Sequence, residues 1–130
     1  MIWRRFLIQS NRTLKDLHYV IQILMGWTDY HLNEFIIKGQ RYTIPNMIGN
    51  PSSCGQYRSD IKLEEFRFRK NEKFLYSYDF TAGWEFEVGL EMILLPNKAR
   101  FILFVLLVVV LLLMKNVVEH IDSINLRIIG

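Results

Sequence analysis

The stretch FLYSYDF-TAG-WEFEVGL, residues 74–90, decides the fold of this 130-residue chain. Apolar and polar side chains alternate along residues 74–80 and again along residues 84–90, which is the period of a β-strand with one buried face. The three residues between these segments include a glycine and supply a turn. The stretch therefore predicts a β-hairpin, the clearest one in the sequence.

Upstream, the sequence predicts one strand and one helix. Residues 3–8 are rich in aromatic and branched side chains, which is typical of a strand. Thr13 has the position of a helix N-cap, Asp16 follows three residues later as an imperfect capping box, and Gly26 is placed to end the helix. An amphipathic helix over residues 14–25 is expected, with an apolar stripe of Leu14, Leu17, Ile21 and Leu24.

A second hairpin is predicted around Lys38-Gly39, with apolar side chains before and after this turn. Residues 45–60 contain prolines, glycines and serines without a periodic face, so we expect a long loop there, and residues 61–69 are ambiguous. The order strand, helix, hairpin, loop, hairpin predicts an α+β domain with a mainly antiparallel sheet and one principal amphipathic helix packed on it. In the hairpin around Lys38-Gly39, the apolar side chains are Leu32, Phe35 and Ile37 before the turn and Tyr42 and Ile44 after it.

An apolar C-terminal segment follows the domain, because residues 101–114 form an unbroken apolar run of 14 residues. We therefore divide the chain into a domain over residues 1–98 and an apolar tail over residues 99–130. A membrane anchor through residues 101–118 is one interpretation of the tail, although a spanning helix needs about 20 apolar residues. The density of branched side chains also suits a strand.

Composition excludes several classes of protein. The single cysteine, Cys54, forms no intrachain disulfide and no thiolate zinc cage, so a disulfide scaffold and a zinc finger are ruled out and a cytoplasmic location is expected. The N-terminus has only three apolar residues after its two arginines and lacks the apolar region of a signal peptide. The net charge of +3 is compatible with a polyanionic partner.

No catalytic, metal or cofactor site emerges from the residue pattern. His18, His31 and His120 are far apart, and Glu34 is predicted on the opposite strand face from His31, so we expect no metal site. Carboxylates near the clearest hairpin could do acid–base chemistry, but a solvated strand face is the favoured interpretation. These carboxylates are those of Asp79, Glu85 and Glu87. No glycine-rich phosphate loop is present, no enzyme class can be argued, and no cofactor is expected.

Basic and aromatic residues together suggest one kind of partner, nucleic acid. Arg4, Arg5, Arg67 and Arg69 are the candidate phosphate contacts, and Phe66, Phe68 or Tyr76 would stack on bases. Arg12, Lys15, Lys70 and Lys73 add positive charge to the same two regions. An ordinary solvated surface is the alternative, because no known nucleic-acid-binding motif accompanies them.

Several blocks in order resemble the plasmid pRiA Orf-3-like family, which is widespread on plasmids and mobile elements. The resemblance covers about residues 2–95, and it implies a compact α+β domain. The blocks are IWRRF at 2–6, TLKDLHYVIQ at 13–22, MGWTDYHL at 25–32, FII at 35–37, GQRY at 39–42, FLYSYDF at 74–80 and GWEFE at 83–87. The motif residues are Trp3, Arg4, Arg5, Leu17, His18, Gly26, Trp27, His31, Tyr78, Asp79, Phe80, Gly83, Trp84 and Glu85.

The chain departs from the family at individual positions and at both ends. Asn33 stands where a second histidine is common, and Phe86 stands where the family usually has a histidine between two glutamates. Relatives generally have another strand before Trp3, and past Leu95 they continue with different, cysteine-containing blocks. Reading the codons of residues 101–119 in a shifted frame permits those blocks in order, so we hypothesise a single-base frameshift near residues 96–101.

The function therefore stays open between classes. A noncatalytic binding module linked to mobile elements, with nucleic acid as the candidate partner, is the favoured interpretation. A membrane-anchored protein, an enzyme of unknown reaction that uses Asp79 or Trp84, and a nonfunctional gene remnant are the alternatives. Some relatives carry a transposon-resolvase label, but the chain shows no recombinase active-site pattern.

Overall fold

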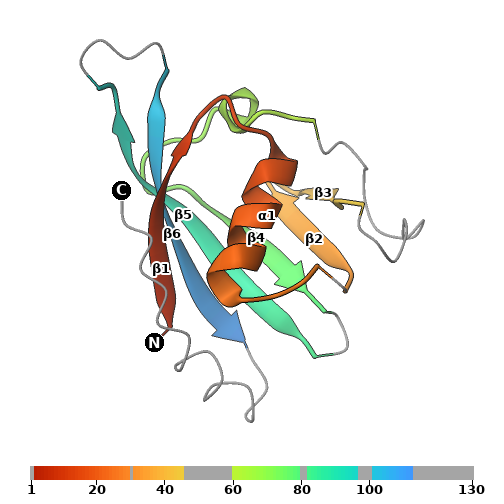
Figure 1. Cartoon of the computed structure of the whole chain (residues 1–130). Helices are drawn as coiled ribbons and strands as arrows, with labels where there is room; N and C mark the ends of the chain where they lie inside the picture. The colour runs from red at the N-terminus through yellow and green to blue at the C-terminus, as the bar shows by residue number, and fades with distance from the viewer. Residues whose placement is uncertain (1, 30, 46–59, 80–81, 97–100, 113–130) are drawn as a thin grey trace.

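The computed structural model describes residues 2–29, 31–45, 60–79, 82–96 and 101–112. Six antiparallel strands form one sheet in the order β1-β6-β5-β4-β2-β3, and α1 lies across one face of it (Figure 1). This confirms the predicted α+β class. The elements are β1 (Trp3–Gln9), α1 (Leu14–Met25), β2 (Asn33–Ile37), β3 (Gln40–Tyr42), the 3-10 helix η1 (Leu63–Phe66), β4 (Lys73–Tyr78), β5 (Trp84–Leu94) and β6 (Leu103–Leu112).

The helix α1 has the predicted bounds because both ends carry local signals. Thr13 Oγ1 accepts a hydrogen bond from the Asp16 backbone N–H at 3.2 Å, and Asp16 Oδ2 accepts one from the Thr13 N–H at 3.0 Å. This reciprocal capping box satisfies donors that the first turn leaves unpaired. Gly26 ends the helix with φ 71°, a left-handed conformation that costs glycine little.

The two predicted hairpins form, and they pair with each other through β2 and β4. Phe35 of β2 lies opposite Tyr76 of β4, and Tyr76 lies opposite Phe86 of β5. The turn between β4 and β5 includes Gly83 at φ 77°. Two apolar residues assigned to the hairpin around Lys38-Gly39, namely Leu32 and Ile44, lie just outside β2 and β3. The loop prediction for residues 46–59, including Cys54, lies outside the described residues.

The apolar run supplies a central strand of the sheet. Its residues from Leu103 to Leu112 form β6, which pairs with β1 on one side and β5 on the other. The family-domain boundary at residue 98 thus precedes a strand of the same sheet. Alternate β6 residues lie in the core, namely Phe104, Leu106, Val108 and Val110.

The membrane-anchor interpretation of the run required a helix, and the described part of the run is a strand. Among the described residues, no helix is long and apolar enough to cross a membrane. Residues 113–118 of the supposed anchor lie outside the described ranges.

The two faces of the sheet differ in chemistry. The face under α1 buries aromatic and aliphatic side chains, with Phe6, Phe35, Tyr76 and Phe86 at 0–1% exposure. The opposite face carries cross-strand ion pairs and remains partly solvated. These pairs join Arg5 to Glu91 at 2.6 Å, Arg41 to Glu34 at 3.2 Å and Lys73 to Glu87 at 3.2 Å.

Candidate functional site

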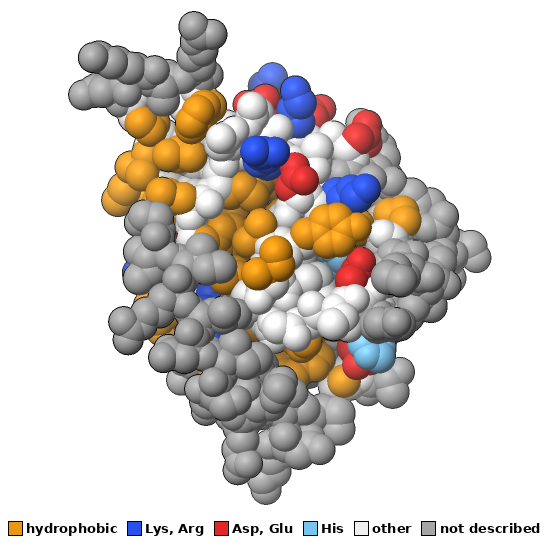
Figure 2. Space-filling view, in the orientation of Figure 1, with side chains coloured by type: hydrophobic (Ala, Val, Ile, Leu, Met, Phe, Trp, Pro, Cys, Tyr) orange, Lys and Arg blue, Asp and Glu red, His pale blue; other side chains and the backbone are white. Residues whose placement is uncertain are grey.

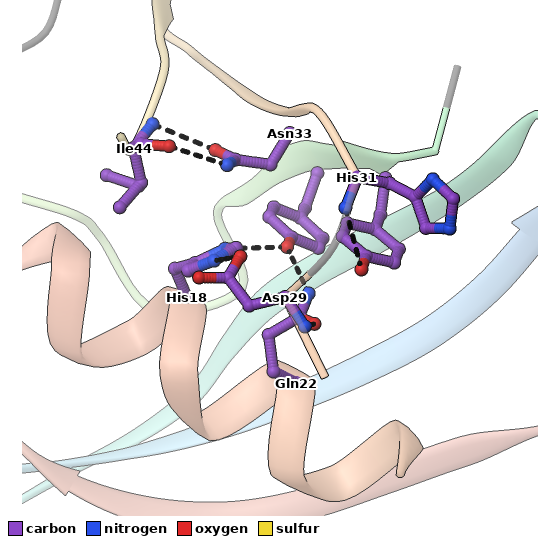
Figure 3. A network of polar contacts seen from close by, with 8 residues as sticks. His18, Gln22, Asp29, His31, Asn33 and Ile44 are labelled. Atoms are coloured by element: carbon purple, nitrogen blue, oxygen red, sulfur yellow. Dashed lines mark hydrogen bonds and ion pairs between the residues drawn. The ribbon is translucent and has the colours of Figure 1, made fainter. Parts of the chain in front are cut away.

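A closed network of polar side chains lies between α1 and the sheet. His18 and Gln22 come from successive turns of α1, Tyr76 from β4, and Asp29 from the segment after the helix (Figure 3). His18 and Tyr76 are fully buried, and the Asp29 side chain is 14% exposed. The network therefore meets the surface only through Asp29 among these four residues.

Four hydrogen bonds close the network into a ring. The Asp29 backbone N–H donates to Gln22 Oε1 at 3.0 Å, and Gln22 Nε2 donates to the Tyr76 hydroxyl at 3.0 Å. The Tyr76 hydroxyl and His18 Nδ1 are 2.7 Å apart, and His18 Nε2 lies 2.7 Å from Asp29 Oδ1. Gln22 Nε2 is itself a donor and cannot take the Tyr76 proton, whereas His18 Nδ1 can accept it, so this proton is assigned to the bond toward His18 Nδ1.

This assignment makes His18 a neutral imidazole. Its Nε2 carries the proton and donates to Asp29, while Nδ1 accepts from Tyr76, so both ring nitrogens have partners. Burial lowers the pKa of His18 below the usual value of 6.5, and the hydrogen bond to Asp29 only partly opposes this effect. Burial also raises the pKa of Tyr76 well above 10. The network is thus neutral at its centre and holds α1 against β4.

A second histidine lies beside this network but faces solvent. The His31 Nε2 is 3.6 Å from Asp79 Oδ2, and the His31 side chain is 54% exposed. A histidine paired with a carboxylate is one arrangement that serves as a general base. However, Asp79 also holds the turn after β4, since its Oδ1 accepts from the Ala82 N–H and its carbonyl accepts from the Gly83 N–H.

The aromatic motif residues build the same end of the domain. The Trp27 ring stacks on Tyr78 with centroids 4.4 Å apart and meets the edge of Trp84 at 5.1 Å. Trp84 is only 4% exposed, so its role is packing and it is not available to a substrate. Asn33 donates to the Ile44 carbonyl at 2.7 Å and accepts from the Ile44 N–H at 2.9 Å (Figure 3).

The remaining motif residues have separate places in the fold. Leu17 is buried in the core, Gly26 and Gly83 adopt positive φ at turns, and Glu85 is exposed on β5. Trp3 is 47% exposed on β1. Phe80 lies outside the described residues. The motif therefore reports on the fold more than on one site.

A basic hollow lies at the end of the sheet where β2 turns into β3 and η1 leads into β4. This hollow has a volume of about 450 Å³, and we call it the basic hollow. Its lining residues are Lys38, Arg69, Lys70, Asn71 and Glu72. Lys38, Asn71 and the adjacent Arg67 have positive φ angles of 50°, 70° and 54°. Three non-glycine residues in this sparsely populated conformation mark a locally constrained backbone.

The charges of the basic hollow are only partly neutralised. Lys38 Nζ lies 3.5 Å from Glu72 and 5.9 Å from the centre of the Phe68 ring. Glu72 Oε1 also accepts from the Arg69 backbone N–H at 2.8 Å, so one carboxylate both fixes the turn and faces Lys38. Within the described part of the chain, no ion pair involves Arg67, Arg69 or Lys70.

The four arginines named from the sequence do not form one cluster. Arg5 is paired with Glu91 on the outer face of the sheet, and Arg4 Nη1 donates to the Trp3 carbonyl at 2.8 Å. Their strand β1 is separated from β4, which follows Arg67 and Arg69, by β6 and β5. The two arginine pairs therefore belong to different surfaces.

Two of the three predicted base-stacking rings are unavailable. Tyr76 is fully buried and Phe68 is 8% exposed. Phe66 is half-buried and stacks on Phe68 with centroids 5.3 Å apart. Of the three rings, only that of Phe66 is partly exposed, and it also meets Tyr42 in an edge contact with centroids 5.5 Å apart. Lys38, which sequence reasoning missed as a phosphate contact, comes from a distant turn, and only sheet pairing brings it to Arg69.

No group of three histidine, cysteine or acidic side chains that could hold a metal ion occurs among the described residues.

Sequence reasoning did not identify His18 and Gln22 as members of the buried network. Their signal was the spacing: positions 14, 18 and 22 follow one face of α1, so a histidine and a glutamine stand on its apolar side.

Comparisons with known proteins give a family. A family model described as "Plasmid pRiA4b ORF-3-like protein" matches residues 1–106, which extends into β6. The chain is similar to "Uncharacterized protein y4hQ" from Sinorhizobium fredii, with 30% identity over 91 residues. That match covers 70% of this chain and 46% of the relative, so the chain spans about half the length of that protein. No solved structure matches the chain significantly.

Proposed function

The chain belongs to the plasmid pRiA4b ORF-3-like family, and from the geometry of its charged surface we propose that it is a noncatalytic module that binds nucleic acid through the basic hollow. The observation that supports the proposal most is the grouping of Lys38, Arg67, Arg69 and Lys70 around two turns, with Glu72 as the facing carboxylate. Cations without acidic partners attract phosphate oxygens and displace their counterions.

The shape and surroundings of the hollow suit a flexible strand of nucleic acid. The hollow is open to solvent, and exposed arginine and lysine side chains rise from its rim. Phe66 offers a partly exposed ring near the same loop, and a base can stack on any aromatic face without sequence preference. These features favour binding of single-stranded nucleic acid over reading of base edges in a duplex groove.

Fluorescence anisotropy with a labelled single-stranded oligonucleotide tests the proposal. We expect binding at low salt that weakens steeply as salt rises, and we expect Lys70→Glu to weaken it about tenfold, since one phosphate contact becomes a repulsion. Lys15→Glu is the matched control, because it is the same substitution on an exposed turn of α1 and changes net charge equally. Equal weakening by the two variants, or no binding at low salt, would contradict the proposal.

The cytoplasmic location, the link to mobile elements and the frameshift remain predictions. A nucleic-acid-binding module linked to mobile elements would act in the cytoplasm. The frameshift hypothesis concerns the gene, and sequencing of the DNA after codon 100 tests it. The apolar run gains a structural role as β6, and this role does not require a shifted frame.

A further inference from the structure

The two edge strands of the sheet differ in how they are protected. β3, at one edge, has three residues with Gln40 and Arg41 exposed, and Pro45 follows it closely. β1, at the other edge, has seven residues and contains no proline, glycine or bulge. Short polar edges discourage strand pairing, whereas a long edge without proline, glycine or a bulge permits it, and β1 has this form although it carries Arg4 and Arg5. β1 is therefore the edge suited to bind another strand.

The hydrogen bonds at the ends of β1 show which backbone groups face outward. The Ser10 N–H donates to the Ile102 carbonyl at 2.8 Å, and the Val110 N–H donates to the Ile2 carbonyl at 3.0 Å. Because backbone groups alternate in direction along an antiparallel strand, even-numbered residues of β1 face β6 and odd-numbered residues face outward. The outward groups belong to Trp3, Arg5, Leu7 and Gln9.

Local contacts occupy two carbonyls near the ends of this edge, and among the described residues its central backbone groups have no strand partner. The Trp3 carbonyl accepts from Arg4 Nη1 at 2.8 Å, and the Gln9 carbonyl accepts from the Arg12 N–H at 3.1 Å. In the described part of the chain, no strand pairs with the outward N–H and C=O groups of Arg5 and Leu7. The N–H and C=O groups of Arg5 and Leu7 are thus four adjacent backbone groups to which one partner strand could bind.

We propose that the partner is β1 of a second copy, paired antiparallel about a two-fold axis at Phe6. In this register Arg5 lies opposite Leu7 of the other copy, so both open N–H groups donate and both open carbonyls accept. Trp3 lies opposite Gln9, and all seven residues of β1 overlap. The two sheets join into one, and both α1 helices lie on the same side of it.

Charge selects this register over its neighbours. A shift of two residues in one direction places Arg5 opposite Arg5 of the other copy, and like charges directly opposite each other destabilise a strand pair. A shift in the other direction places Leu7 opposite Leu7 and pairs only residues 5–9. The self-complementary register is the one that uses the whole strand without a charge conflict. It also covers Trp3, which is 47% exposed in one copy.

Cysteine cross-linking tests the register in a Cys54→Ser background. Chains carrying Arg5→Cys and chains carrying Leu7→Cys are purified separately, mixed and oxidised. Directly opposed residues of a strand pair lie within the Cα separation that a disulfide allows. We expect a cross-linked dimer from the mixture and little from either variant alone. The proposal would be overturned if either variant alone gave a higher yield of cross-linked dimer than the mixture, or if no sample gave a cross-linked dimer.

The oligomeric state in solution is the second measurement. Light scattering on full-length protein should give a dimer, and Leu7→Lys should convert it to a monomer by placing a lysine opposite Arg5. Leu75→Lys is the matched control, because Leu75 is a partly exposed leucine on the inner strand β4. Circular dichroism confirms folding of both variants. If the parent protein is a monomer, the proposal that a second copy binds to β1 is wrong. Slow hydrogen exchange of the Arg5 and Leu7 amides in such a monomer would show that another group pairs with this edge.

Discussion

The buried network and the basic hollow are two polar regions built by opposite rules. In the network, His18, Gln22 and Tyr76 are each hydrogen-bonded to another member, and burial favours the neutral form of His18 by lowering its pKa. In the hollow, Lys38, Arg69 and Lys70 are exposed, and one carboxylate faces them. The first arrangement serves stability and the second leaves charge for a partner, so substitutions should separate the two roles.

The largest expected loss of stability follows His18→Ala. The substitution empties a buried site and leaves the Tyr76 hydroxyl and the Asp29 carboxylate without their partner, which we expect to cost about 3 kcal/mol. Urea denaturation measures the free energy of unfolding. Lys15→Ala, on the exposed side of the same helix, should change it by less than about 0.5 kcal/mol. A similar small effect from both substitutions would show that the network contributes little.

Tyr76→Phe should have a smaller effect, because it keeps the buried ring and removes only the hydroxyl. His18 Nδ1 loses its donor and the Gln22 amide loses its acceptor, so we expect a loss of about 1–2 kcal/mol. The control is Tyr19→Phe, which removes the hydroxyl of an exposed tyrosine on α1 and should be neutral. Thermal and urea unfolding of the pair provide the comparison.

Stability should also fall with acidity in a defined direction. The pKa of His18 is lowered in the folded state, so below pH 6.5 the unfolded chain binds a proton that the folded chain resists. The contribution is therefore fully present above pH 6.5 and is lost as pH falls from there toward the lowered pKa. Unfolding free energies across this range should show a steeper loss for the parent than for His18→Gln, which has no imidazole.

The smallest effect on stability is expected in the basic hollow. Arg69→Ala and Lys70→Ala remove exposed side chains whose charges have no ion pair among the described residues, so each should change the unfolding free energy by less than about 0.5 kcal/mol. Their effect should appear in nucleic-acid binding. A large loss of stability from either substitution would show that the hollow is part of the structural framework.

The sequence predicted the elements whose signals are local. Thr13, Asp16 and Gly26 define both ends of α1, and alternation defines the β4–β5 hairpin, because capping and pleat depend on neighbouring residues. The role of residues 103–112 was not predictable in the same way. A uniformly apolar run has no polar–apolar period. Such a run is expected both for a central strand and for a short buried helix, so the pattern does not distinguish them.

The candidate sites depended on contacts that the sequence does not display. His18 and Tyr76 are separated by 58 positions, and Lys38 lies in the β2–β3 turn whereas Glu72 lies in the turn before β4. The predicted arginines were grouped by closeness in the sequence, whereas the sheet order places β6 and β5 between β1 and β4. Local chemistry predicted which residues would attract phosphate, and only the strand order shows which of them lie on the same side of the sheet's strand sequence.

The central claim is that the basic hollow contacts phosphates, and the salt dependence of binding tests it most directly. Association constants for a single-stranded oligonucleotide should be measured from low to moderate salt for the parent chain and for the combined Arg69→Ala and Lys70→Ala variant. The account predicts a linear decrease of log K with log salt, and a slope that is shallower in the variant by about 0.7 for each lost contact. Identical slopes would contradict the account.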